Sequence, residues 1–184
     1  EGTILGVESL SRHFVTYCVG PFRALDYSFQ NEYLDIVGGY KFGGCTLGFI
    51  DGMLALILNK LGINYVASYK ELASLLQDNW ISIGGGESFN FAYTAALFHY
   101  IDLGILGVVL FPFIFGKIVT KITNKFILSC NPMLLVLLGY LFTIMIDTVF
   151  TWRLYRHQAF ITFGFIACIY IWYKKNYLRR SWGV

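Results

Sequence analysis

The sequence predicts an all-α integral membrane protein, a multi-spanning helical bundle with a large outer loop containing short interfacial helices. Hydrophobic residues make up 57% of the 184 residues and charged residues only 14%. A soluble domain usually carries about 25% charged residues. Long apolar runs fill the second half of the chain, whereas the first half mixes apolar and polar residues with many glycines. Most side chains therefore need an apolar solvent.

Three apolar segments in residues 91–184 predict transmembrane helices, at about 93–122, 131–151 and 156–174. A helix needs about 20 mainly apolar residues to cross roughly 30 Å of hydrocarbon. The first segment reaches this length if Lys117 and Lys121 extend their ammonium groups to one membrane surface. We then expect Asp102 at the opposite surface, where its carboxylate stays hydrated.

The basic residues predict the orientation of these helices. Lys117, Lys121 and Lys125 lie around the loop between the first two spans, and four more basic residues follow the third span. The loop between the second and third spans carries only Arg153 and Arg156. Short cytoplasmic loops are enriched in Lys and Arg. The lysine-rich loop and the C-terminus are therefore expected in the cytoplasm, and residues 1–90 form a large extracytoplasmic loop.

Within residues 1–90, one apolar stretch near 45–63 has helical spacing but is interrupted by polar residues. Its uninterrupted part has the length of an interfacial or re-entrant segment, and a true span is the less favoured alternative. The apolar run from His13 to Phe22 is too short to span, and we expect Pro21 to end a helix there. Three glycines at 84–86 indicate a loop, whose backbone could also approach a ligand closely.

The chain begins at Glu1 without an initiator methionine or a signal-peptide pattern, so we expect the C-terminal part of a longer membrane protein. The four cysteines form no C-x-x-C motif, and no metal site or cofactor is predicted. Only Cys18 and Cys45 could share an oxidising compartment, and nothing in the sequence decides whether they pair. The absence of a Lys/Arg run interleaved with aromatics argues against nucleic acid as a partner.

The predicted orientation gathers charged and titratable residues at the outer surface. They are Arg12, His13, Arg23, His99, Asp102, Asp147, Arg153, Arg156 and His157. Arg153 and Arg156 have i, i+3 spacing, so they would face the same way on a helical extension. Their guanidinium groups suit a pyrophosphate, although they could simply anchor helix ends to lipid phosphates. Asp147 lies within a span and could be functional or paired with Arg153. Histidines are candidate bases because imidazole titrates near neutrality.

Three stretches resemble elements of one known family, in the order that the family has them. YTAALFHYIDLG at 93–104, followed by Gly107, is similar to the "Y-T…D-F-G-x-x-G" start of a late helix in O-antigen polymerases. Upstream, YCVGPFRALD at 17–26 is similar to their "Y-x-x-G-P-x-x-A-x-D" stretch. GYKFGGCTLGF at 39–49 is similar to the "G-x-x-T-F-G" element. His99 stands where the family often carries a basic residue.

The resemblance implies a GT-C-like enzyme of the bacterial cytoplasmic membrane, with its large loop on the outer, periplasmic face. Such enzymes polymerise oligosaccharide repeat units carried on undecaprenyl diphosphate into O-antigen or capsular polysaccharide. A chain-length regulator protein is an expected partner besides the lipid bilayer. We assign Arg12, Arg23, Tyr93, Arg153 and Arg156 to substrate binding, the arginines holding the pyrophosphate. His13, His99 and Asp102 are assigned to acceptor positioning or base catalysis.

Two alternatives remain open at this point. A related O-antigen ligase would use the same donor and transfer the glycan to the lipid A core. A flippase or other transporter of lipid-linked oligosaccharides would require polar groups near the bilayer midplane and paired broken helices. The three predicted spans have few polar residues at mid-depth, which ranks transport third.

Overall fold

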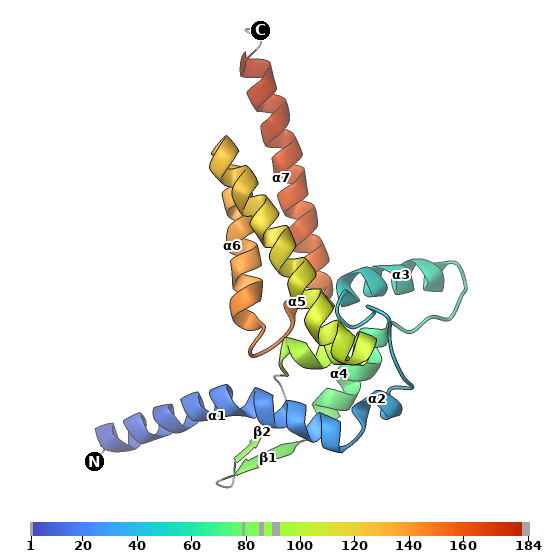
Figure 1. The fold of residues 1–184 in the computed structure, drawn as a ribbon, viewed down its shortest axis with the longest axis vertical. Coiled ribbons are helices and arrows are strands. Elements are labelled where there is room, and N and C mark those ends of the chain that lie inside the picture. The colour runs from blue at the N-terminus through green and yellow to red at the C-terminus, as the bar shows by residue number, and fades with distance from the viewer. Residues whose placement is uncertain (1, 79, 85–86, 90–92, 182–184) are drawn as a thin grey trace.

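The computed structural model describes residues 2–78, 80–84, 87–89 and 93–181, and its fold is mostly helical. Three long helices form an upright bundle: α5 (Ala95–Ser129), α6 (Pro132–Asp147) and α7 (His157–Ser181). The other elements gather beneath the bundle, at the end opposite the C-terminus (Figure 1). The fold therefore consists of an apolar bundle standing on a more polar base.

The boundaries of the bundle helices differ from the prediction by several residues. Helix α5 runs on past 122 to Ser129, α6 ends at Asp147 rather than near 151, and α7 continues past 174. Of the helices in the described part of the chain, Ala95–Ser129 is long and apolar enough to cross a membrane. Helix α6 is a shorter apolar helix. Pro132 occupies the first turn of α6, behind the Asn131 cap, where its missing N–H costs nothing.

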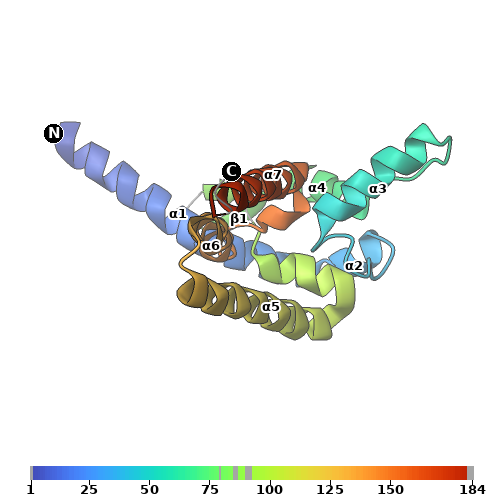
Figure 2. The same ribbon diagram turned by 90° about the horizontal axis from the view of Figure 1, so that it is seen from above.

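Helix α1 (Gly2–Gln30) crosses the base from one side to the other (Figures 1 and 2). The expectation that Pro21 ends a helix is wrong, because α1 continues through it for nine further residues. Packing offsets the hydrogen bond lost at proline: Pro21 is fully buried, and Gly20 lies against the ring of Phe89. A Cβ atom on Gly20 would come within 2.6 Å of that ring.

The remaining base elements are α2 (Tyr33–Ile36), α3 (Gly48–Lys60), α4 (Ser68–Asp78) and a hairpin of β1 (Ile81–Gly84) with β2 (Glu87–Phe89). The helix expected near 45–63 is present as the 13-residue α3, which projects sideways from the base (Figure 2). Helix α4 and the hairpin were not predicted. In the hairpin, Ile81 pairs with Phe89 and Ser82 with Ser88; Gly85 and Gly86 lie outside the described residues.

The apolar core lies where the base meets the lower end of the bundle. Its most buried large side chains come from elements distant in sequence, namely Leu72 of α4, Phe89 of β2, Leu97 and Ile101 of α5, and Ile144 of α6. Burying each such side chain contributes about 1.5–3 kcal/mol of transfer free energy. This core holds the first turns of α5 beneath the bundle, where the candidate site is formed.

Candidate functional site

Helix α5 is broken where the sequence predicted a continuous helix. Leu103 (φ −144°, ψ 21°) and Gly104 (φ 61°, ψ −146°) leave the helical region, so a first segment ends at Asp102 and a second begins at Ile105. The backbone at Gly104 is one that essentially only glycine adopts without strain. The second segment folds back so closely that a Cβ atom on Gly107 would overlap the carbonyl oxygen of His99. The backbone conformation at Gly104 and the close contact at Gly107 thus explain why both positions of the D-x-G-x-x-G pattern are glycine.

A loop formed by residues 39–47, here called the covering loop, packs over this break. The last carbonyl groups of a helix have no partner within the helix. Here the N–H of Lys41 donates to the carbonyl of Ile101 (3.1 Å), and the N–H of Phe42 donates to the carbonyl of Asp102 (3.1 Å). Residues 39–49 and 93–104, which lie far apart in the sequence, are therefore joined directly through their backbones.

The side chain of Asp102 strengthens the same contact. Its Oδ1 accepts the N–H of Cys45 (2.9 Å) and its Oδ2 accepts the N–H of Thr46 (2.6 Å). We expected a hydrated carboxylate, but Asp102 is fully buried. Burial of a carboxylate is tolerated here because both oxygens are hydrogen-bonded. Burial, followed by the negative charge of Asp102, raises the pKa of the Cys45 thiol well above its ordinary value.

Thr46 connects the covering loop to two further residues of the site. Its Oγ1 lies 3.0 Å from Nδ1 of His99, and its carbonyl accepts the indole N–H of Trp152 at 2.5 Å. The rings of His99 and Trp152 meet edge to face, with centroids 4.8 Å apart. All three side chains are almost completely buried. Sequence reasoning missed Thr46 and Trp152, although Thr46 lies within the stretch that resembles the family.

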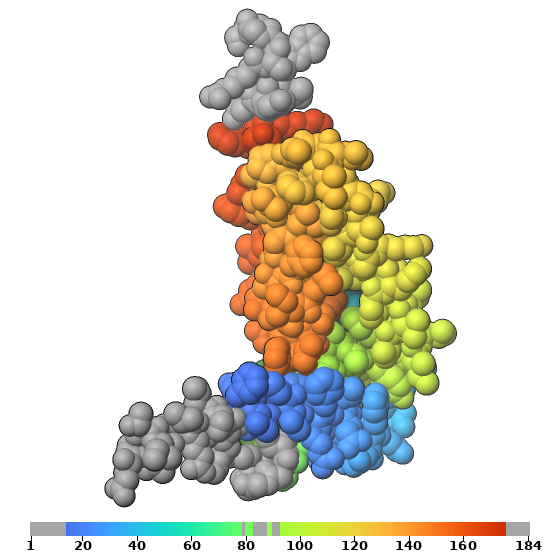
Figure 3. Space-filling view, turned by 60° about the vertical axis from the view of Figure 1, so that its left-hand side comes forward, coloured from blue at the N-terminus to red at the C-terminus, as the bar shows by residue number. Residues whose placement is uncertain are grey.

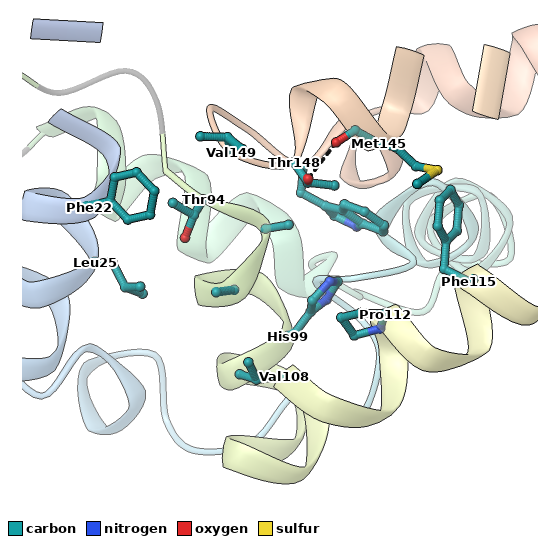
Figure 4. Close-up of a pocket in the computed structure, with 14 residues that line it drawn as sticks. Phe22, Leu25, Thr94, His99, Val108, Pro112, Phe115, Met145, Thr148 and Val149 are labelled. Atoms are coloured by element: carbon teal, nitrogen blue, oxygen red, sulfur yellow. Dashed lines mark hydrogen bonds between the residues drawn. The ribbon is translucent and has the colours of Figure 1, made fainter. Parts of the chain in front are cut away.

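Next to this cluster is an open pocket of about 420 Å³ between α1, the two segments of α5, and the C-terminal end of α6. Its lining residues are Phe22, Leu25, Thr94, Ala95, Ala96, His99, Val108, Pro112, Phe115, Gly116, Met145, Thr148, Val149 and Trp152. Figure 3 shows a hollow between α6 and α5 just above α1. In Figure 4, His99 extends from the first segment of α5 toward Pro112 on the second. Among these lining residues, His99 alone carries an ionisable side chain.

Arg153 and Arg156 lie in the connection between α6 and α7. Arg153, in the 3-10 helix η1 (Arg153–Tyr155), forms an ion pair with Asp147, which confirms that expected pairing. Arg156 follows η1 in an extended conformation, so the two arginines do not share a helical extension. The Nε of Arg156 donates to the hydroxyl of Tyr155 (2.7 Å), and Tyr155 stacks on Phe98.

The other predicted residues are distributed as follows. Arg23 is exposed on α1 and pairs with Asp26 at 3.2 Å. Tyr93 is buried, and burial together with its neighbour Tyr33 raises the pKa of its hydroxyl. The side chains of Arg12 and His13 lie outside the described residues. Arg23 and Arg153 each directly follow a pocket residue in the chain, Phe22 and Trp152, so arginines flank the pocket in sequence.

The structure describes Cys18 and Cys45 as free thiols, with Cys45 completely buried. Within the described ranges, no group of three or more His, Cys, Asp or Glu side chains could hold a metal ion. The site thus offers one imidazole, a mainly apolar pocket and nearby guanidinium groups. No family model, no curated protein and no solved structure matches this chain.

Proposed function

We propose that this protein is a membrane glycosyltransferase that polymerises oligosaccharide repeat units carried on undecaprenyl diphosphate, at the outer face of the bacterial cytoplasmic membrane. One observation carries the proposal. The stretches that resemble O-antigen polymerases are far apart in sequence, yet Asp102 and the carbonyls beside it bind the covering loop directly. The third stretch contributes Phe22 and Leu25 to the same pocket as His99. The three stretches that resemble the family thus all contribute to one site.

The pocket suits the apolar part of a lipid-linked donor. Most of its lining is aliphatic or aromatic, and it opens beside the bundle that we propose to lie in the membrane. The isoprenoid chain would occupy this pocket, and the pyrophosphate would lie at its polar rim near Arg153 and Arg156. Guanidinium groups match phosphate oxygens with paired N–H donors. Near a bilayer, such preorganised charge is more effective than in bulk water.

The chemistry requires a base and a stabilised leaving group. A hydroxyl at the non-reducing end of the incoming unit attacks the anomeric carbon of the growing glycan, and the bond to the phosphate oxygen breaks. The lipid pyrophosphate departs with the bonding electrons, held by the arginines. His99 accepts the proton of the attacking hydroxyl, with its ring oriented by Thr46 through Nδ1.

In this proposal Asp102 is a positioning residue. Both of its oxygens already accept backbone N–H groups, so it does not act on substrate in this arrangement. It holds the covering loop against the break in α5, and the loop carries Thr46 to His99. The resulting prediction is that loss of Asp102 disturbs His99 indirectly, through Thr46.

The proposal places α5, α6 and α7 across the membrane, with residues 1–90 outside the cytoplasm. The hydrophobic length of α5 supports this placement. Helix α3 supports it as well, because it projects sideways at the level where the bundle meets the base (Figure 1) and exposes Leu54, Leu56 and Ile57. Such a helix fits the boundary between headgroups and acyl chains. A chain-length regulator remains the proposed protein partner.

The test compares variants of Arg156 and His99 by the length of surface glycan on a gel that resolves single repeats. Arg156→Ala should shorten the ladder, whereas Arg156→Lys should keep part of it, because one charge remains without the paired donors. His99→Gln should abolish chains longer than one repeat while the protein stays in the membrane. Lys125→Ala, at the opposite end of α5, is the matched control. Unchanged long chains in both Arg156→Ala and His99→Gln would exclude the proposed chemistry.

A further inference from the structure

The second segment of α5 has a polar face that the proposed site does not use. Lys117, Thr120, Lys121 and Asn124 stand at positions i, i+3, i+4 and i+7, so they lie on one side of the helix. They line a groove of about 660 Å³ whose other walls are Pro112, Phe113 and Gly116. This groove, from Pro112 to Asn124, is called the lysine groove below.

The polar residues of the lysine groove face away from the rest of the described structure, whereas Pro112 and Gly116 also line the pocket of the candidate site. On the opposite side of α5, Val119 is buried and Ile122 and Phe126 pack against the core. Lys117, Lys121 and the other polar residues of the groove are exposed. The groove is therefore a surface to which no other described element is fitted.

The position of Lys117 along α5 makes its exposure unusual. It lies 12 residues before Ser129, the last residue of the helix, which is about 18 Å at a rise of about 1.5 Å per residue. Its ammonium nitrogen lies over the ring of Phe113, 4.6 Å from the centroid, and so points one turn away from the Ser129 end. We expected Lys117 to extend toward the cytoplasmic surface, but its side chain takes the opposite direction.

A charged side chain on a membrane-spanning helix calls for a counter-charge. A lysine there is unfavourable unless it meets water or an opposite charge. Two ammonium groups at i, i+4, as in Lys117 and Lys121, also repel each other. Among the residues that the structure describes, no carboxylate lies within ion-pair distance of either lysine.

We propose that the lysine groove binds a transmembrane helix carrying an aspartate or glutamate within its apolar stretch. This inference rests on the membrane placement of α5 in the proposed function. The carboxylate would lie between Lys117 and Lys121, and the Asn124 amide could donate to the same helix. Gly116 has open space beside it, and with Thr120 it forms a small-xxx-small pair of the kind that lets two membrane helices approach closely.

A lipid phosphate is the rival occupant of the groove. Headgroups lie at the membrane surface, whereas the ammonium group of Lys117 lies over Phe113, one turn further from the lysine-rich end of α5. An acidic helix can place its carboxylate at any depth. The direction of the Lys117 side chain therefore favours the helix.

The experiment reverses the charges and follows protein abundance in membranes by immunoblot, not glycan length. The double variant Lys117→Glu with Lys121→Glu should fall at least fivefold in abundance, because its two new carboxylates would repel the carboxylate of the partner helix. Lys125→Glu, which lies on α5 but outside the groove, is the control and should stay near wild type. Selection for restored abundance should yield suppressor mutations. These should replace an Asp or Glu by Lys or Arg inside an apolar stretch of a membrane helix.

Three results would overturn this inference. One is normal abundance of the charge-reversed variant. Another is a selection in which every mutation that restores abundance lies outside the acidic residues of membrane helices. The third is an adduct of purified protein with phosphatidylglycerol, seen by native mass spectrometry and lost in Lys117→Met with Lys121→Met, which would assign the groove to lipid. An unaltered glycan ladder would refute the proposed polymerase function but would leave the abundance and suppressor results intact.

Discussion

Replacing Asp102 by alanine should release the covering loop from the break in α5. The substitution leaves the buried N–H groups of Cys45 and Thr46 without an acceptor. Each unsatisfied buried donor costs about 1–3 kcal/mol, so the loop should be destabilised by about 2–6 kcal/mol. Since about 1.4 kcal/mol is a tenfold change, the opening equilibrium should rise roughly 30-fold to 20,000-fold.

Amide hydrogen exchange of the purified protein in detergent measures this opening directly. In the wild type, the amides of Cys45 and Thr46 should be strongly protected, and in Asp102→Ala their exchange should accelerate by the factor given above. Asp102→Asn, which keeps an acceptor for one of the two amides, should show a smaller effect and serves if the alanine variant fails to fold.

Asp26→Ala is the matched control for this measurement. Asp26 is exposed and pairs with Arg23 on the surface of α1, and such pairs contribute about 0–1 kcal/mol. The two amides should therefore exchange at the wild-type rate in this variant. Equal exchange in wild type and Asp102→Ala would refute the account of Asp102 as the residue that holds the loop.

Further predictions concern the glycines and the cysteines. In a thermal-denaturation assay, Gly104→Ala should destabilise the protein by about 1–3 kcal/mol because of the positive φ at this position. Gly107→Ala should destabilise it more, because the new Cβ would overlap a backbone carbonyl. Gly139→Ala, with open space around it, should be neutral or slightly stabilising in the same assay. Cys45 is buried and its pKa is raised, so it should stay a neutral thiol and resist maleimide up to pH 9, where Cys130, which is exposed, reacts within minutes. Rapid labelling of Cys45 in folded protein would contradict the packing of the covering loop.

The long-range pattern of the chain was readable from hydrophobicity. The helical bundle, the short helix α3 and the pair formed by Arg153 and Asp147 follow from apolar run lengths and the spacing of charges. These features depend on local composition. They could therefore be predicted without knowing how distant segments meet.

The break in α5 could not be predicted in the same way, because it depends on a distant partner. Leu103 and Gly104 lie in an apolar run that by itself favours a continuous helix, and one glycine costs a helix only about 1 kcal/mol. The break exists because the covering loop supplies N–H groups to the carbonyls that it exposes. The prediction of a hydrated Asp102 was wrong for the same reason, because the hydrophobic pattern does not show that the covering loop buries its carboxylate.

Pro21 shows the converse error. Local chemistry predicted the end of a helix, and tertiary packing against Phe89 continues it. Thr46 and Trp152 were missed because neither is charged, and their importance lies in hydrogen bonds to residues far away in sequence. Such residues become visible only when the contacts between elements are known.

The length distribution of surface polysaccharide in cells lacking the gene tests whether this protein polymerises lipid-linked repeat units. Without the gene the ladder should collapse to a single repeat, and it should return when the wild-type gene is supplied. Polymer accumulating on its lipid carrier would indicate a ligase, and single units trapped on the cytoplasmic side would indicate a flippase. An unchanged ladder would contradict the assignment altogether.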